Sequence, residues 1–248
     1  MLPSIHIGPL MIQLPGLALL VGLWLSMEIA SRHAVRLRLS GEAVANMIFW
    51  GLGAGAVAAR LGYAARFPDV FLQAPLSLLA LNPQTLDWPT GLLGGLTAMW
   101  LYAQRKHLPW RPTLDALGMG LATMAVFVSL AHVFSGDAYG MPTQLPWGIE
   151  LWGAKRHPTQ IYELVLTLAV LAWVGERARK SLRGDGTVFL ETVGLLAAVR
   201  LFVEAFRGDS VAIANGIRVA QVVALAVLLV VLWLYPRWQK AAPQPKKT

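Results

Sequence analysis

Long runs of apolar residues, separated by short polar segments, dominate the pattern along the 248 residues of this chain. Each run approaches the roughly 17–25 residues that a helix needs to cross the hydrocarbon core of a bilayer. The pattern therefore predicts an all-α integral membrane protein, a bundle of about seven transmembrane helices. The expected helices cover residues 8–30, 43–65, 88–104, 114–134, 159–175, 187–206 and 217–235.

Two segments fall outside this pattern of long spans. Residues 70–81 are too few to cross a bilayer and contain Pro75, so we expect an interfacial or re-entrant segment there. Residues 241–248, "AAPQPKKT", are polar and basic, which is typical of a disordered tail. We therefore expect one transmembrane domain over residues 1–240, followed by a short cytoplasmic tail.

Glycines recur at a spacing of four in two of the expected helices. Gly51 and Gly55 form one such pair, and Gly91 and Gly95 form another. Small residues at this spacing let helix backbones approach closely. We expect these glycines to serve tight helix packing.

The basic residues indicate how the chain is oriented in the membrane. Most of the 21 lysine and arginine residues fall in alternate loops and the C-terminal tail, which would all lie on one side. The positive-inside rule makes that side cytoplasmic, so the N-terminus is expected outside and the C-terminus inside. The residues concerned are Arg32, Arg36, Arg38, Arg105, Lys106, Arg111, Arg177, Arg179, Lys180, Arg183, Arg237, Lys240, Lys246 and Lys247.

Composition supports the membrane assignment and excludes some chemistry. The chain is 56% hydrophobic and only 14% charged, whereas soluble domains carry about a quarter charged residues. It has no cysteine, which excludes disulfides, thiolate metal sites and a cysteine nucleophile. The net charge of +8 fits basic cytoplasmic loops and anionic lipid headgroups, so no nucleic-acid partner is expected.

The remaining cations lie within helices or near their outer ends. Arg200, Glu204 and Arg207 are spaced to share one helical face, where a charge at membrane depth must be paired or line a wet cavity. They indicate either a cationic pocket for a phosphate, with Glu204 orienting an arginine, or an internal salt bridge. Arg60, one turn before Tyr63, adds either another phosphate ligand or a snorkelling anchor.

Two polar segments interrupt the apolar pattern at the expected outer face. In "HVFSGDAYG", Gly136 and Gly140 enclose Asp137, which predicts a sharp polar turn. His132 precedes this turn inside a span; it is either a hydrogen-bonded structural residue or a general base. In "RHPTQIYE", a polar cluster opens the fifth helix, either as a binding element or as an ordinary interfacial helix entry. Its polar members are Arg156, His157, Gln160, Tyr162 and Glu163.

These segments resemble the bacterial prolipoprotein diacylglyceryl transferases in residue order and over almost the whole chain. "RHPTQIYE" is similar to the family's R-H-P-S-Q-L-Y-E, "ARLGY" to its G-R-I-G-Y, and "VRLFVEAFR" to its F-R-I-I-V-E-F-F-R. The turn from Gly136 to Gly140 is similar to the family's N-G-E-x-x-G, with Asp137 in place of Glu. Asp115 and Gln221 also fall where the family has Asp and Gln.

The resemblance implies an enzyme of the bacterial inner membrane, multi-pass, with its active site facing the outer side. Such an enzyme moves the diacylglyceryl group of phosphatidylglycerol to the lipobox cysteine thiol of a preprolipoprotein, forms a thioether, releases glycerol phosphate and uses no metal or cofactor. It implies catalytic roles for Arg200, Glu204, Asp137 and His132. It implies substrate binding by Arg60, Tyr63, Gly136, Gly140, Arg156, His157, Gln160, Tyr162, Glu163 and Arg207.

The chain departs from the family pattern at three positions. Thr90-Gly91-Leu92 stands where the family has H-G-G, Ser129 stands where it has a phosphate-binding arginine, and Pro15 replaces a tyrosine. His132, one turn beyond Ser129, is a candidate to replace the family's base. Two alternatives follow from these departures and from the cations: a phospholipid-binding or helper protein without catalysis, and a small anion transporter, which lacks the support of an inverted repeat.

Overall fold

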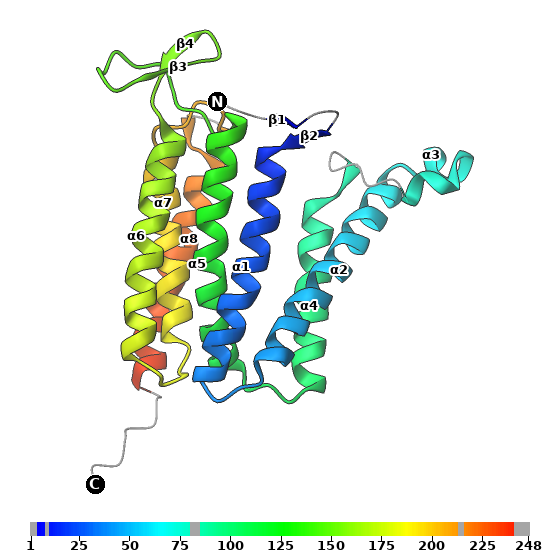
Figure 1. Cartoon of the computed structure of the whole chain (residues 1–248), viewed down its shortest axis with the longest axis vertical. Coiled ribbons are helices and arrows are strands. Elements are labelled where there is room, and N and C mark those ends of the chain that lie inside the picture. The colour runs from blue at the N-terminus through cyan, green and yellow to red at the C-terminus, as the bar shows by residue number, and fades with distance from the viewer. Residues whose placement is uncertain (1–3, 8–9, 80–84, 213–215, 241–248) are drawn as a thin grey trace. The chain divides into compact units, whose positions relative to one another are not determined.

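The computed structural model describes residues 4–7, 10–79, 85–212 and 216–240, and these residues are almost entirely helical (Figure 1). Each of the seven helices expected from the sequence is present, although several boundaries differ. The α-helices are α1 (Leu14–Arg36), α2 (Gly41–Arg66), α3 (Pro68–Gln73), α4 (Trp88–Arg105), α5 (Trp110–Ser135), α6 (Thr159–Lys180), α7 (Thr187–Glu204) and α8 (Val219–Lys240). The strands are β1 (Ser4–Ile7), β2 (Leu10–Gln13), β3 (Ile149–Leu151) and β4 (Ala154–Arg156), in two antiparallel hairpins, β1–β2 and β3–β4.

The helices have the surface of a membrane protein. Among the described residues, α1, α2, α5 and α8 are long and apolar enough to cross a bilayer. Large apolar side chains such as Leu20, Trp24, Trp100 and Leu232 are exposed along the helices. Soluble monomers rarely expose apolar surface on this scale, so these side chains suit contact with lipid. The count of seven spans stays a prediction.

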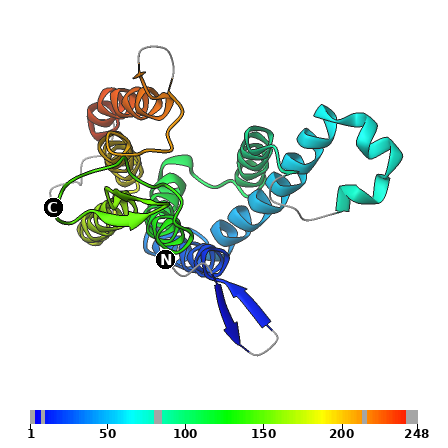
Figure 2. The same cartoon turned by 90° about the horizontal axis from the view of Figure 1, so that it is seen from above.

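The contacts divide the chain into two compact units. The first contains α1 and α5–α8, from the N-terminus to Arg38 and from Arg111 onward, and the second contains residues 39–110. Within the first unit, α7 lies between α6 and α8 in the view from above (Figure 2). The core of this unit includes Val170, Val174 and Ala178 of α6, packed against Val188 of α7.

A buried carboxylate fixes the start of α7. Asp115 of α5 accepts hydrogen bonds from the backbone N–H groups of Gly186 (2.9 Å) and Phe189 (3.0 Å), so it caps the N-terminus of α7 from a neighbouring helix. Gly118 of α5 lies against the same turn, where a Cβ would be 3.0 Å from the Phe189 backbone. The capped turn and the close approach together hold α7 against α5.

In the second unit, α2 and α4 pack tightly through glycine. A Cβ added to Gly55 would lie 3.0 Å from the carbonyl oxygen of Gly91, and one added to Gly95 would lie 2.9 Å from that of Gly51. These are the two glycine pairs singled out by their spacing. The prediction that they serve close packing is confirmed.

The first helix begins later than its apolar pattern predicts. Residues 10–13 form strand β2, paired with β1 in the register Ser4↔Gln13 to Ile7↔Leu10, and α1 starts only at Leu14. Pro15 sits in the first turn, where a missing N–H costs nothing, and this favours the later start. The expected span 8–30 is therefore wrong at both ends, and Arg32 and Arg36 lie in the helix.

A similar shift affects the fifth expected helix, and the segment at 70–81 has structure of its own. α6 continues to Lys180, because Arg177, Arg179 and Lys180 in its last turn complement the negative end of the helix dipole. Residues 70–79 fall in α3 and a 3₁₀ helix, Pro75–Leu79, while residues 80 and 81 lie outside the described residues. The tail at 241–248 also lies outside them.

The glycine packing can be tested with a matched pair in α2. We expect Gly55→Val to destabilise the helix pair by about 1–3 kcal/mol, because the added side chain overpacks against Gly91. Gly53→Val is the control, since a Cβ at Gly53 meets no atom within 4 Å. Thermal unfolding in detergent measures both, and equal midpoints for the two variants would contradict the packing.

Candidate functional site

Polar side chains gather where α5 ends and α6 begins. His132 lies in the last turn of α5, and its Nδ1 is 3.0 Å from Oε2 of Glu163 in the second turn of α6. The histidine side chain remains 27% exposed, while that of Glu163 is 14% exposed. A carboxylate that holds one ring nitrogen fixes the imidazole orientation and leaves Nε2 to exchange a proton. The pair therefore has the arrangement of a general base with an orienting carboxylate.

A cluster of cations surrounds one buried carboxylate at the end of α7. Glu204 is 1% exposed, and its Oε2 is 2.9 Å from Nη2 of Arg200 and 3.9 Å from Nε of Arg207. Arg218 also donates a hydrogen bond to the Glu204 backbone carbonyl. Arg200 and Glu204 share a face of α7 as predicted, whereas Arg207 lies beyond the end of the helix and still reaches Glu204. Asp209 also pairs with Arg207, so three arginines stand against two carboxylates, and the cluster can attract a further anion.

The two groups of residues share one electrostatic environment. Arg200 and Arg207 are close enough to Glu163 for their charges to act on its carboxylate. His132 of α5, Glu163 of α6 and the arginines at the end of α7 thus come from three helices. A histidine–carboxylate pair and a group of arginines therefore influence each other electrostatically.

Backbone contacts join the turn after α5 to the end of α7. Met141 N donates to Phe206 O at 2.8 Å, and Gly208 N donates to Tyr139 O at 2.8 Å. Gly140 also lies close to the segment before α6, because a Cβ there would collide with the backbone of His157. Gly136 has a φ of 79°, in the left-handed region that favours glycine. The sharp turn predicted from these two glycines is confirmed.

The first turn of α6 holds the same segment from the other side. Thr159 Oγ1 donates to Ala138 O at 2.6 Å, and the Gln160 side-chain amide donates to Asp137 O at 3.0 Å. Arg156 donates to Leu151 O at 3.0 Å and to Gly140 O at 3.3 Å. The polar residues of "RHPTQIYE" thus include several that fasten the turn, and the Asp137 side chain itself points to an exposed surface.

An apolar cavity of about 450 Å³ borders this polar region. The His157 ring packs 5.3 Å from that of Phe206, and the Tyr162 hydroxyl accepts a hydrogen bond from Trp147 Nε1 at 2.9 Å. The cavity is lined mainly by aromatic and aliphatic side chains, and its size and polarity suit a lipid chain. These side chains include Trp147, His157, Tyr162, Phe202 and Phe206.

Arg60 and Tyr63 lie in the second unit, where their contacts are local. Arg60 donates to Leu78 O and Thr85 O, each at 3.0 Å, and also to Ser77 O. Its guanidinium is stacked 5.2 Å from the Phe71 ring centroid, while the Tyr63 ring packs 4.9 Å from that of Phe67. The arginine thereby ties the segment after α3 to α2.

The positions that depart from the family pattern have structural partners of their own. Thr90 lies in the first turn of α4, and its N–H donates to the capping carboxylate of Asp87 at 3.2 Å. Ser129 is fully buried; its hydroxyl donates to Ala125 O at 3.0 Å and accepts from the Thr167 hydroxyl at 3.3 Å. Ser129 therefore fastens α5 to α6 one turn before His132.

Three contributors to the site were not singled out by their sequence. Asp209 accepts two hydrogen bonds from Arg207, of 2.9 and 2.8 Å. It lies two residues after Arg207, and this closeness in sequence could have indicated the ion pair. Arg218 and Trp147 come from loops or helix ends distant along the chain, so no local pattern could assign them. In the part of the chain that the structure describes, no group of three or more histidine or acidic residues is placed to hold a metal ion.

Comparison with known proteins gives a consistent result. A family model described as prolipoprotein diacylglyceryl transferase matches residues 3–237. The phosphatidylglycerol–prolipoprotein diacylglyceryl transferase of Lactobacillus gasseri is 27% identical over 259 residues, covering 96% of this chain and 93% of the relative. The protein of that name from Cupriavidus pinatubonensis is 26% identical over 97% of this chain and 94% of its own length. That from Synechococcus elongatus is 28% identical over 93% and 86%.

The Arg207–Asp209 pair predicts a pH-dependent contribution to stability. Burial opposes ionisation of Asp209, but the hydrogen bonds and charge of Arg207 outweigh burial and lower the pKa of this carboxyl. A depressed pKa adds stability above the unfolded-state pKa of about 3.9, which is lost as the pH falls through the folded-state pKa. We expect Asp209→Asn to unfold at a lower temperature than wild type at pH 7.

The difference between the two unfolding temperatures should shrink below about pH 4, where the unfolded-state carboxyl is protonated. Glu150→Gln is the control, since Glu150 is exposed on strand β3. A gap that stays constant across this pH range would show that the ion pair does not supply the stability.

Proposed function

Because the chain belongs to the prolipoprotein diacylglyceryl transferase family, we propose that it transfers the diacylglyceryl group of phosphatidylglycerol to the lipobox cysteine thiol of a preprolipoprotein. In this reaction the thiol sulfur bonds to the glyceryl carbon, and the bond between that carbon and the phosphate oxygen breaks. A thioether and glycerol phosphate are the products, and the thiol proton passes to a base. The observation that carries the proposal is that the His132–Glu163 pair lies close enough to Arg200 and Arg207 for their charges to act on Glu163.

His132 is the proposed base for the thiol. Its Nδ1 is held by Glu163, so the neutral ring can take the thiol proton on Nε2 while the carboxylate stabilises the imidazolium that forms. The thiolate is the nucleophile that attacks the glyceryl carbon. This role compensates for Thr90, which stands where the family has its histidine and is engaged with Asp87.

Arg200 and Arg207 are the proposed ligands of the lipid phosphate. As the carbon–oxygen bond breaks, negative charge accumulates on the departing phosphate, and guanidinium groups nearby stabilise that charge. Glu204 would orient Arg200, while Asp209 holds Arg207 in place. The buried Glu204 carboxylate balances part of the positive charge before the lipid arrives.

The remaining predicted residues would support binding around this centre. Gly136, Gly140, Arg156 and Gln160 shape the turn that faces the end of α7. The apolar cavity bordered by His157 and Tyr162 suits an acyl chain of the donor or the apolar part of the signal peptide. Asp137 is proposed as a polar contact for substrate. Arg60 and Tyr63, considered within the second unit alone, are proposed as further lipid contacts.

We also propose the orientation inferred from the basic residues: seven spans in the bacterial inner membrane, with the N-terminus outside and the active site facing outward. Two features of the first unit support it. α1, α6 and α8 end in basic turns that include Arg36, Arg179 and Lys240, at one end of this unit (Figure 1). His132, in the last turn of α5, and Glu163, near the start of α6, lie at the other end of this unit, away from the basic turns (Figure 1).

The base assignment predicts the effect of removing the imidazole. We expect His132→Ala to lower transfer by about 10²–10⁴-fold, the contribution typical of general acid–base catalysis. The assay uses vesicles containing phosphatidylglycerol and a lipobox peptide, with the lipidated peptide detected by mass. His107→Ala, in the turn after α4, is the matched control. Unchanged transfer by His132→Ala would show that another group takes the proton.

The phosphate assignment predicts a graded response at Arg200. We expect Arg200→Gln to lower kcat by about 10²-fold, and Arg200→Lys to retain part of the activity because it keeps the charge without the planar fork. Arg183→Gln, an exposed arginine after α6, is the control. Wild-type protein that binds phosphatidylglycerol yet yields no lipidated peptide would contradict the proposed transfer and favour a lipid-binding role.

A further inference from the structure

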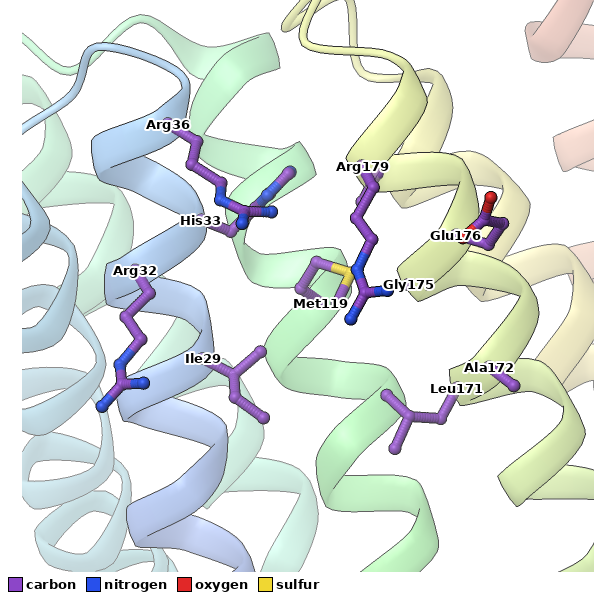
Figure 3. Close-up of a pocket in the computed structure, with 11 residues that line it drawn as sticks. Ile29, Arg32, His33, Arg36, Met119, Leu171, Ala172, Gly175, Glu176 and Arg179 are labelled. Atoms are coloured by element: carbon purple, nitrogen blue, oxygen red, sulfur yellow. The ribbon is translucent and has the colours of Figure 1, made fainter.

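A second cavity of about 630 Å³ lies between α1 and α6, with Met119 of α5 among its lining residues (Figure 3). It is separate from the candidate transfer site. Met119 precedes His132 by 13 positions on the same helix, which places the two about 20 Å apart along the helix axis. The cavity lies where α1 and α6 end, whereas the transfer site lies where α6 begins.

Basic side chains line one part of this cavity. Arg36 of α1 and Arg179 of α6 extend from opposite sides into the space between the helices (Figure 3). Within the described ranges, neither guanidinium group forms a hydrogen bond or an ion pair, whereas that of Arg32 is paired with Glu28 at 2.5 Å. Cations in a last helical turn complement the helix dipole, but that effect does not require a cavity between them.

A buried histidine is the second observation that indicates a ligand. His33 lines the cavity and is only 4% exposed, and its Nε2 is buried without a hydrogen-bond partner. A buried polar atom without a partner is destabilising, so such atoms are rarely left unpaired. An oxygen atom of a ligand in the cavity would supply the missing partner.

The cavity also has apolar side chains among its lining residues. Ile29 and Leu171 lie farther from the C-terminal ends of α1 and α6 than do the guanidinium of Arg36 and the ring of His33 (Figure 3). Glu176 is the carboxylate among the lining residues, and it is paired with Lys180 at 2.9 Å. Positive charge beside an apolar wall matches the two halves of an anionic phospholipid.

We propose that this cavity binds the phosphate of an anionic phospholipid from the leaflet at that end of the protein. Arg36 and Arg179 hold the phosphate oxygens, His33 donates to one of them through Nε2, and an acyl chain lies along Ile29 and Leu171. This lipid is not the one consumed in transfer, since the cavity is at the opposite end of α6 from Glu163. It is a bound lipid that joins α1 to α6.

Native mass spectrometry of the full-length protein in neutral detergent tests the proposal, with dioleoyl phosphatidic acid as the probe. We expect Arg36→Gln with Arg179→Gln to bind one lipid fewer than wild type, or to bind it about tenfold more weakly. His33→Gln, which keeps a side chain of similar size, should weaken the same binding event. The matched control is Arg38→Gln with Arg183→Gln, which removes two arginines that do not line the cavity.

Three results would overturn the proposal. Equal loss in both double variants would mean that surface charge alone attracts the lipid, and no loss in either would mean that the cavity is unused. Displacement of the lipid by inorganic phosphate at equal concentration would assign the cavity to free phosphate. Arg200→Lys separates this inference from the transfer reaction, because it should impair transfer while the cavity retains its lipid.

Discussion

The buried carboxylate of Glu204 is the constraint on which the site depends. A carboxylate that is 1% exposed is costly unless positive charges lie beside it. Arg200 and Arg207 meet that need through the carboxylate, while Arg218 reaches the backbone of the same residue from the segment before α8. The loop before α6 then reaches the end of α7 through the Gly140–Arg207 bridge. Ion pairs with the carboxylate and hydrogen bonds to the backbone around it thus bring three separate segments together.

Much of this arrangement could be predicted from the sequence where the pattern is local. The seven helices followed from apolar runs, and the shared face of Arg200, Glu204 and Arg207 followed from their spacing of four and three. The glycine pairs of α2 and α4 were recognisable because small-residue spacing has one main physical use. Each of these predictions concerns residues close together along the chain, although Arg207 lies just beyond the end of α7.

The rest depends on contacts between distant segments. His132 meets Glu163 across 31 positions, and no spacing rule relates residues on different helices. Arg60 donates hydrogen bonds to carbonyl oxygens of the segment after α3. The position of an arginine within an apolar run does not predict such partners. The start of α1 was misplaced because the apolar residues of β2 resemble a helix when read without their partner strand. Gln160 shows the same limit, since its amide serves the backbone of the turn at Asp137.

The cap on α7 has a consequence for how this family member can vary. Asp115 holds the first turn of α7 in place, and the contacts of Glu204 hold the last residue of this helix. The number of residues between these two points is therefore constrained. Inserting one residue would rotate everything beyond it by about 100° and advance it by about 1.5 Å. Such a change would turn Glu204 away from Arg218 and the segment before α8 without altering any side chain. Insertions and deletions within α7 are therefore far less tolerable than substitutions on its lipid-facing side.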